Sequence, residues 1–174
     1  MPFSDPIADG PTIQTADTRA LKNGVNIHKC IKLLERIRAY SDIPIGLLMY
    51  SNLIINYGPE KFYRKMHAMD INSVLIADVP VEESDDFIAI SRRHNIDTVF
   101  LVTPLTTDNR LENILQKCTG FVYLVARLGV TGARQDLQGS TLELIKRVRP
   151  KTELPLNVGF GISEPEHVRR VIEA

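Results

Sequence analysis

Short apolar runs recur along this chain of 174 residues, and they limit its possible folds more than any other feature. Each run is nearly continuous in apolar residues instead of alternating with polar ones. This pattern is typical of strands that are buried on both faces of a parallel sheet. We therefore predict strands at residues 45–49, 73–77, 98–102, 121–125 and 156–159.

Between these runs, apolar residues recur at helical spacing. Asn26 and Pro59 suit the first positions of two helices, and residues 140–143 and 163–166 have the form of capping boxes. The predicted helices begin near Asn26, Pro59, Glu83, Asp108, Ser140 and Ser163.

Strands and helices thus alternate, and two architectures satisfy that order: a doubly wound open sheet or a (β/α)₈ barrel. No G-x-G-x-x-G motif follows the first strand, which disfavours a dinucleotide-binding sheet. Polar residues cluster directly after the strands, and in both architectures this edge carries the active site. The longest irregular stretch, residues 126–139, has the length of a lid or binding loop.

The chain is short for a complete barrel, which typically needs about 250 residues. We expect one domain over residues 1–174: an α/β, incomplete (β/α)₈ barrel with about five complete units and a strand end at residues 1–4. Neither end of the sequence resembles a natural terminus, so we expect the barrel to be truncated at both ends.

Composition excludes several classes of function. The 21 basic and 21 acidic residues balance, which argues against a nucleic-acid or membrane-surface binder. The start of the chain lacks the pattern of a signal peptide, and we expect a cytoplasmic protein. Cys30 and Cys118 form no C-x-x-C pair, and the four histidines lie singly, so we expect buried free thiols and no metal site.

Five motifs resemble, in order, those of the tryptophan synthase alpha chain family. Together they extend over essentially the whole chain, and their order and spacing make the resemblance specific. They are residues 2–14 (PFSDPIADGPTIQ), 45–52 (IGLLMYSN), 75–84 (LIADVPVEES), 127–132 (RLGVTG) and 159–163 (GFGIS).

The resemblance implies a (β/α)₈ barrel that cleaves indole-3-glycerol phosphate to indole and glyceraldehyde 3-phosphate. It implies no cofactor in this chain. The partner is a beta chain that uses pyridoxal phosphate, in an α2β2 heterotetramer. The chemistry itself requires a carboxylic acid near indole C3 and a carboxylate near the ring N–H.

Asp9 matches the family aspartate that faces the indole nitrogen, although an Asp-Gly pair is also a common turn. In the family, the second carboxylate is a glutamate that lies just before the position of Pro2. This chain begins at Met1, in place of the residue that directly precedes Pro2, so we expect the catalytic glutamate to be missing from it.

Other positions match the family's binding residues. Tyr50 and Tyr123 match indole-pocket positions, although an aromatic core residue is an alternative for Tyr123, and Met49 suits the core nearly as well as the pocket. Thr131 matches a lid residue that reaches the aspartate. Gly132 and Gly161 match backbone positions that bind the phosphate. The matching positions are Met49, Tyr50, Tyr123, Thr131, Gly132 and Gly161.

Asn52, Asp78, Pro80 and the loop 5–14 match the surface that meets the beta chain, although each could be an ordinary loop or cap residue. Two other functions stay open. The chain could be a non-catalytic fragment that only binds the beta chain, or another phosphate-binding barrel such as an epimerase or isomerase.

Overall fold

The computed structural model describes residues 1–125, 139–159, 162 and 164–174. Five parallel strands form one sheet in the order β1-β2-β3-β4-β5. Each strand pairs with the next along the chain, for example Leu48 with Leu75 and Tyr123 with Asn157. The strands are β1 (Gly46–Met49), β2 (Ser73–Ile76), β3 (Asp97–Val102), β4 (Val122–Val125) and β5 (Leu156–Gly159).

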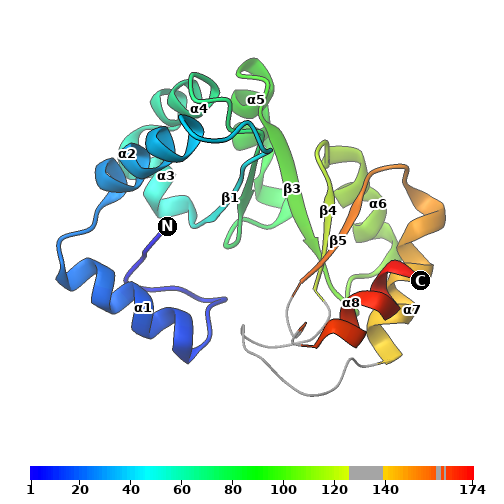
Figure 1. Cartoon of the computed structure of the whole chain (residues 1–174). Helices are drawn as coiled ribbons and strands as arrows, with labels where there is room; N and C mark the ends of the chain where they lie inside the picture. Colours follow the sequence, from blue (N-terminus) through cyan, green and yellow to red (C-terminus); the bar gives the residue numbers. More distant parts are fainter. Residues whose placement is uncertain (126–138, 160–161, 163) are drawn as a thin grey trace.

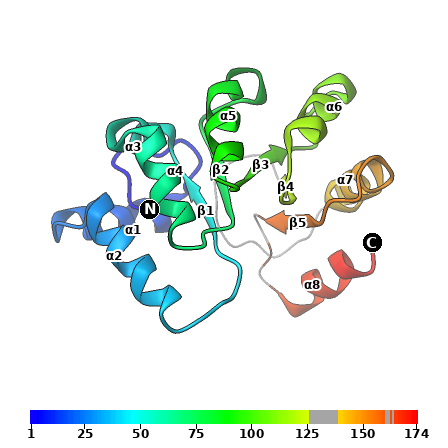
Figure 2. The same cartoon turned by 90° about the horizontal axis from the view of Figure 1, so that it is seen from above.

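Helices connect the strands and cover one side of the sheet. Figure 2 shows α2 to α8 fanned in an arc around the strands, with no helix inside the arc. The α-helices are α1 (Pro11–Lys22), α2 (Ile27–Arg38), α3 (Ser51–Tyr57), α4 (Pro59–His67), α5 (Asp85–Arg93), α6 (Asp108–Lys117), α7 (Gly139–Val148) and α8 (Pro165–Ile172). Two 3₁₀ turns, Val81–Glu83 and Arg149–Lys151, precede α5 and β5.

This topology decides between the two predicted architectures. A doubly wound sheet has helices on both faces and a reversal in strand order. Here the order is uniform and the helices α2 to α8 lie on the convex side, so the sheet is a curled, open part of a (β/α)₈ barrel. Its two edges are β1 and β5.

The core lies between the convex face of the sheet and the helices. One cluster packs β1 and β2 against α2, α3 and α4, and a second packs β3 and β4 against α6 and α7. Met49 is completely buried in the first cluster, in agreement with the core interpretation of this residue. Cys118 is buried in the second cluster and Cys30 is only partly buried; both thiols are free.

The helix starts show which local signals were correct. Asn26 caps α2 by accepting a hydrogen bond from the backbone N–H of Lys29, at 3.1 Å. Gly58 has φ of +92°, which an L side chain rarely adopts, and it lets α3 turn directly into Pro59 of α4. The two predicted capping boxes are shifted: α7 begins at Gly139, before Ser140, and Glu164 is the N-cap of α8 in place of Ser163.

The predicted strand end at residues 1–4 is wrong, because these residues form no strand. Pro2 lacks an N–H group and cannot donate a hydrogen bond to a neighbouring strand. Helix α1 was also not predicted, and its first turn occupies residues 11–14 of the expected loop. No residue of α1 is buried, so the helix has no apolar stripe to reveal it.

Figure 1 shows α1 apart from the arc of helices, below the carboxyl ends of the strands. Within the described ranges, no helix is both long and apolar enough to cross a membrane.

Candidate functional site

The N-terminal segment brings Asp9 to Tyr50, the residue that directly follows β1 at its carboxyl end. The Tyr50 hydroxyl donates a hydrogen bond of 2.9 Å to Oδ2 of Asp9. The two residues are 41 positions apart in the chain, yet both matched the family's site. The structure therefore joins a candidate catalytic carboxylate to a candidate binding residue.

Tyr50 is itself firmly held. Its side chain is only 2% exposed, its ring stacks on Phe3 with centroids 5.2 Å apart, and its hydroxyl accepts a 3.1 Å hydrogen bond from the N–H of Ala8. Burial raises the pKa of Tyr50 to about 12, and the neighbouring Asp9 carboxylate adds to that increase. Tyr50 therefore stays a neutral hydrogen-bond donor at neutral pH.

Asp9 keeps capacity for a ligand. Its backbone carbonyl accepts a 2.7 Å hydrogen bond from the side-chain amide of Gln14, which fixes the loop at the start of α1. Its carboxylate is half-buried, and Oδ1 accepts no hydrogen bond from the residues that the structure describes. A carboxylate held through one oxygen can accept an N–H from a ligand through the other.

Asp78 lies beside this pair and caps a helix that follows β1. Its Oδ1 accepts the backbone N–H of Ser51 at 2.7 Å, and its Oδ2 accepts the Ser51 hydroxyl at 2.8 Å. Tyr50, the N-cap residue of α3, makes no side-chain cap of its own. Asp78, at the end of β2, thus supplies the cap of α3 from a distant part of the chain and fixes the Tyr50–Ser51 corner.

We predict that Asp78→Ala lowers the free energy of unfolding by about 1–2 kcal/mol, because two hydrogen bonds at a helix start are lost. Urea unfolding measured by circular dichroism tests this. Asp78→Asn, which keeps one acceptor oxygen, should cost less than Asp78→Ala. Equal losses for both variants would show that capping is not what Asp78 contributes.

The other two predicted partner-surface residues lie at the same edge. Asn52 is exposed on α3 and accepts a hydrogen bond from Asn56, and Pro80 is exposed after β2. Asp78 and Pro80 border a hollow of about 330 Å³ between the loops after β2 and β3. Ile7 and Leu105, about 70% exposed, form its rim. An apolar rim of this kind suits contact with another surface.

Tyr123 lies on the concave face, away from the helices. It borders a small hollow of about 160 Å³ together with apolar residues of the first three strands, including Leu48, Leu75 and Val99. Leu48 is 40% exposed there, which is unusual for a leucine inside a sheet. Burial raises the pKa of the half-buried Tyr123 hydroxyl. Among the described residues, this hollow is thus lined mainly by apolar side chains, together with the Tyr123 phenol and Ser73.

The ring of Tyr123 passes directly over Gly159 at the end of β5. A Cβ atom at position 159 would lie 1.8 Å from the Tyr123 hydroxyl oxygen and 2.3 Å from the ring carbon that bears it. No pair of non-bonded atoms tolerates these distances, so glycine is required for the ring to lie where it does.

We predict that Gly159→Ala lowers the free energy of unfolding by about 1–3 kcal/mol, because the Tyr123 ring or the β5 backbone must move. The double variant Gly159→Ala/Tyr123→Ala should lose less than the sum of the two single variants. Chemical denaturation of all four proteins measures this coupling. Strict additivity would mean that the close approach does not constrain Tyr123.

Three predicted binding residues, Thr131, Gly132 and Gly161, lie outside the described residues, as does most of the predicted lid 126–139. Helix α8 begins soon after Gly161, with Pro165 in its first turn. In the parts of the chain that the structure describes, no group of three His, Cys, Asp or Glu side chains could hold a metal ion.

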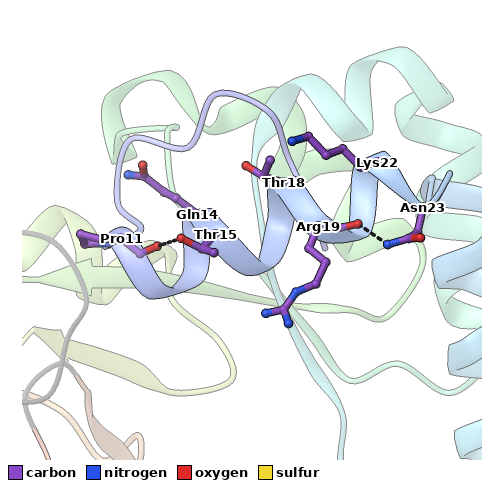
Figure 3. A pocket seen from close by; sticks show the side chains of 7 residues that line it. All are labelled: Pro11, Gln14, Thr15, Thr18, Arg19, Lys22 and Asn23. Carbon is purple, nitrogen blue, oxygen red and sulfur yellow. Dashed lines mark hydrogen bonds between the residues drawn. The ribbon is translucent and has the colours of Figure 1, made fainter.

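A larger hollow, of about 750 Å³, lies along α1 (Figure 3). All of its lining residues come from this one helix and its C-cap, and all are exposed. They do not converge from several elements, as the groups of an active site do, and we assign no chemistry to them.

Sequence reasoning missed several residues around Asp9. Phe3 and Gln14 were quoted only as parts of a motif, and Asp17 was not singled out. Nor were Leu48, Leu75 and Val99 recognised as facing the concave side, because their strands are apolar on both faces. Gly46 and Leu48, and likewise Phe121 and Tyr123, are two positions apart in the sequence and therefore share one face of their strand. This spacing is the one sequence signal that could have identified the concave face.

Comparison with known proteins gives a consistent result. The sequence profile described as tryptophan synthase alpha chain matches residues 1–174. The alpha chain of Methanothermobacter thermautotrophicus is 48% identical over 173 residues, which are 99% of this chain and 64% of that protein. The alpha chain of Methanocaldococcus jannaschii is 43% identical over 174 residues, which are 99% of this chain and 62% of that protein.

A solved structure of the tryptophan synthase α2β2 complex from the hyperthermophile Pyrococcus furiosus is also similar. The TM-score is 0.91 at 40% sequence identity, and the match covers 99% of this chain and 69% of that chain. With coverages of 64% and 62%, this chain spans less than two thirds of the length of the two curated relatives. On the sequence match over all 174 residues and the shared fold, it belongs to the tryptophan synthase alpha chain family.

Proposed function

We propose that this chain supplies part of the active site for the retro-aldol cleavage of indole-3-glycerol phosphate. The observation that carries this proposal is the Asp9 carboxylate, which Tyr50 holds at the carboxyl edge of the strands and whose other oxygen accepts no hydrogen bond from the described residues. Membership of the family supports this reaction class over that of an epimerase or isomerase.

The reaction breaks the bond between indole C3 and the glycerol side chain. A proton is added to C3, and the ring nitrogen carries the resulting positive charge. The side-chain hydroxyl then loses its proton, the C–C bond breaks, and its electron pair returns to the indole ring. Indole and glyceraldehyde 3-phosphate leave, and no net proton is consumed.

Asp9 accepts the ring N–H through its available carboxylate oxygen. As positive charge develops on the nitrogen, this charge-assisted hydrogen bond becomes stronger, so Asp9 stabilises the transition state more than the bound substrate. Tyr50 prevents the carboxylate from rotating away. The apolar concave face near Tyr123 receives the indole ring, and the Gly132 and Gly161 backbone together with the start of α8 bind the phosphate.

Proton transfer at C3 needs a second carboxylic acid. We propose that this acid is the family's glutamate before the position of Pro2, supplied by a part of the relatives' length that lies outside the match. Within the matched part, Asp5 belongs to the loop motif and is exposed, and its carboxylate accepts a hydrogen bond from the Ser4 hydroxyl. It does not replace that acid.

The edge that bears Asn52, Asp78 and Pro80 binds the beta chain, which carries pyridoxal phosphate and joins the indole to serine. The solved relative is an α2β2 complex, and the exposed apolar rim of Ile7 and Leu105 suits such a contact. The alpha chain itself needs no cofactor for this acid–base reaction.

The test uses a chimera in which residues 1–174 replace the matching part of the Methanothermobacter alpha chain, whose own flanking segments are kept. The chimera should release indole from indole-3-glycerol phosphate, and added Methanothermobacter beta chain should co-elute with it. Binding without indole release would favour the non-catalytic alternative. If the chimera neither releases indole nor binds the beta chain, the proposed function is rejected.

A further inference from the structure

The loop between β3 and α6, residues 103–107, presents an exposed apolar side chain from a hydrogen-bonded turn. The N–H of Thr103 donates to Oγ1 of Thr106 at 2.9 Å, and the N–H of Thr106 donates to the carbonyl of Thr103 at 3.0 Å. The N–H of Leu105 donates to Oγ1 of Thr103 at 3.2 Å. Thr106 is 6% exposed, whereas Leu105 is 71% exposed. The turn therefore fixes the backbone from which an exposed leucine projects.

Arg147, in the last turn of α7, binds this turn from a distant part of the chain. Its guanidinium donates one hydrogen bond to the carbonyl of Thr106 and another, of 3.5 Å, to the carbonyl of Pro104. The two bonds join positions 41 and 43 residues apart. A planar guanidinium can bridge two carbonyls in this way because its donors point in fixed directions. Arg147 thus clamps the backbone on both sides of Leu105.

The clamp leaves one donor of Arg147 without a partner. In the part of the chain that the structure describes, Nε of Arg147 is the one buried side-chain nitrogen or oxygen that makes no hydrogen bond. A buried donor without a partner destabilises a fold. Natural proteins accept such local costs mainly at functional sites, so this arrangement is better explained by a role of the turn than by the stability of α7.

Arg149, two residues further on, makes a comparable clamp elsewhere. Its Nη2 donates to the carbonyls of Thr152 at 2.6 Å and of Leu154 at 3.0 Å. These carbonyls belong to the loop before β5, which lies at the amino end of the strands. Arg149 is therefore a matched control for Arg147, because it also binds two backbone carbonyls but at the opposite end of the sheet.

The turn that Arg147 clamps lies on the edge proposed to bind the beta chain. Leu105 and Ile7 form the apolar rim of the 330 Å³ hollow that Asp78 and Pro80 border. An apolar side chain on a fixed backbone loses less conformational entropy on binding than one on a mobile loop. A clamp on this turn is thus of direct use to a partner that contacts Leu105.

We propose that Arg147 is a positioning residue for the partner surface, which fixes the turn 103–107 so that Leu105 is a preformed anchor for the beta chain. This inference rests on the proposed function, because it commits to the beta chain as the partner at this edge. The rim at Leu105 is continuous with the predicted partner residues Asp78 and Pro80, and a similar solved structure is an α2β2 complex. Arg147 acts through the turn and need not touch the partner.

The first experiment tests the clamp by amide hydrogen exchange in the chimera. Arg147→Met keeps the apolar stem of the side chain and removes all of its donors. The amides of Thr103, Leu105 and Thr106 should then exchange at least about 10-fold faster, since the turn opens without breaking bonds to the guanidinium. Arg149→Met should leave these three amides unchanged. Unchanged exchange in Arg147→Met overturns the inference.

The second experiment measures the affinity of the chimera for the Methanothermobacter beta chain by biolayer interferometry. Leu105→Ala should weaken binding by about 10-fold or more, as expected for an apolar anchor. Arg147→Met should weaken it by about 3- to 10-fold, and by less than about 2-fold when Leu105→Ala is already present, because the two act through one contact. Arg149→Met should bind as the chimera does. Full affinity in folded Arg147→Met, or a full additional loss in the double variant, overturns the inference.

The remaining outcomes separate folding, partner and function. If Arg147→Met does not fold, Leu105→Ala decides, because Leu105 is exposed and its truncation spares the core; full affinity in that variant then overturns the inference. Indole release by the chimera alone should be equal in all folded variants. If the chimera binds no beta chain, the proposed partner has failed, whereas amide exchange still shows whether Arg147 clamps the turn. If the chimera binds and Arg147→Met binds equally well, only the positioning role is wrong.

Discussion

Asp9→Asn in the chimera is expected to reduce kcat for indole release by about 10²- to 10⁴-fold. The amide keeps an oxygen that accepts the Tyr50 hydroxyl, so the local geometry should persist. What is lost is the negative charge opposite the developing positive charge on the indole nitrogen. Because that charge matters most in the transition state, kcat should fall much more than substrate affinity.

The assay follows free indole under saturating substrate. Asp42→Asn is the matched control, because Asp42 is an exposed carboxylate before the amino end of β1 and should not affect the rate. The circular dichroism spectra of both variants should match that of the chimera. An Asp9→Asn chimera that releases indole at the unchanged rate would show that Asp9 does not pair with the ring nitrogen.

The second large effect concerns the acid that protonates C3. In the chimera, replacing by Gln the family's glutamate in the segment before Pro2 should reduce kcat by at least about 10²-fold, since indole leaves poorly until C3 is protonated. The 174-residue chain does not contain that glutamate and should be slower than the chimera by at least the same factor.

Binding of free indole distinguishes a loss of proton transfer from a loss of the indole-binding surface. The Glu→Gln chimera should bind indole as tightly as the chimera does, because the apolar concave face near Leu48 and Tyr123 is unchanged. Full activity of the 174-residue chain would refute the proposal that the glutamate is indispensable.

The regular part of the fold follows from local patterns. All five predicted strands are present, and their ends differ from the prediction by one residue at most. The prediction succeeds because short, continuous apolar runs bounded by polar residues are typical of buried strands in an α/β chain. Helices with an apolar stripe were also found. Helix α1 was missed because it has no such stripe, and α3 because its seven residues follow β1 directly and take their cap from Asp78.

The site was less predictable from the sequence. Asp9 and Tyr50 could be named because their motifs resemble a family, but their hydrogen bond joins positions 41 residues apart, and no local pattern encodes it. The same holds for Phe3, whose ring stacks on Tyr50, a residue distant in the sequence. Local periodicity also could not tell the concave from the convex face of strands that are apolar on both sides.

The central claim is that the available oxygen of Asp9 receives the indole N–H. The most direct test is a crystal structure of the chimera with an unreactive substrate analogue that lacks the side-chain hydroxyl groups. The account predicts an indole nitrogen about 2.7–3.1 Å from a carboxylate oxygen of Asp9, with Tyr50 still bonded to the other oxygen. An indole ring bound on the concave face with its nitrogen directed away from Asp9 would contradict it.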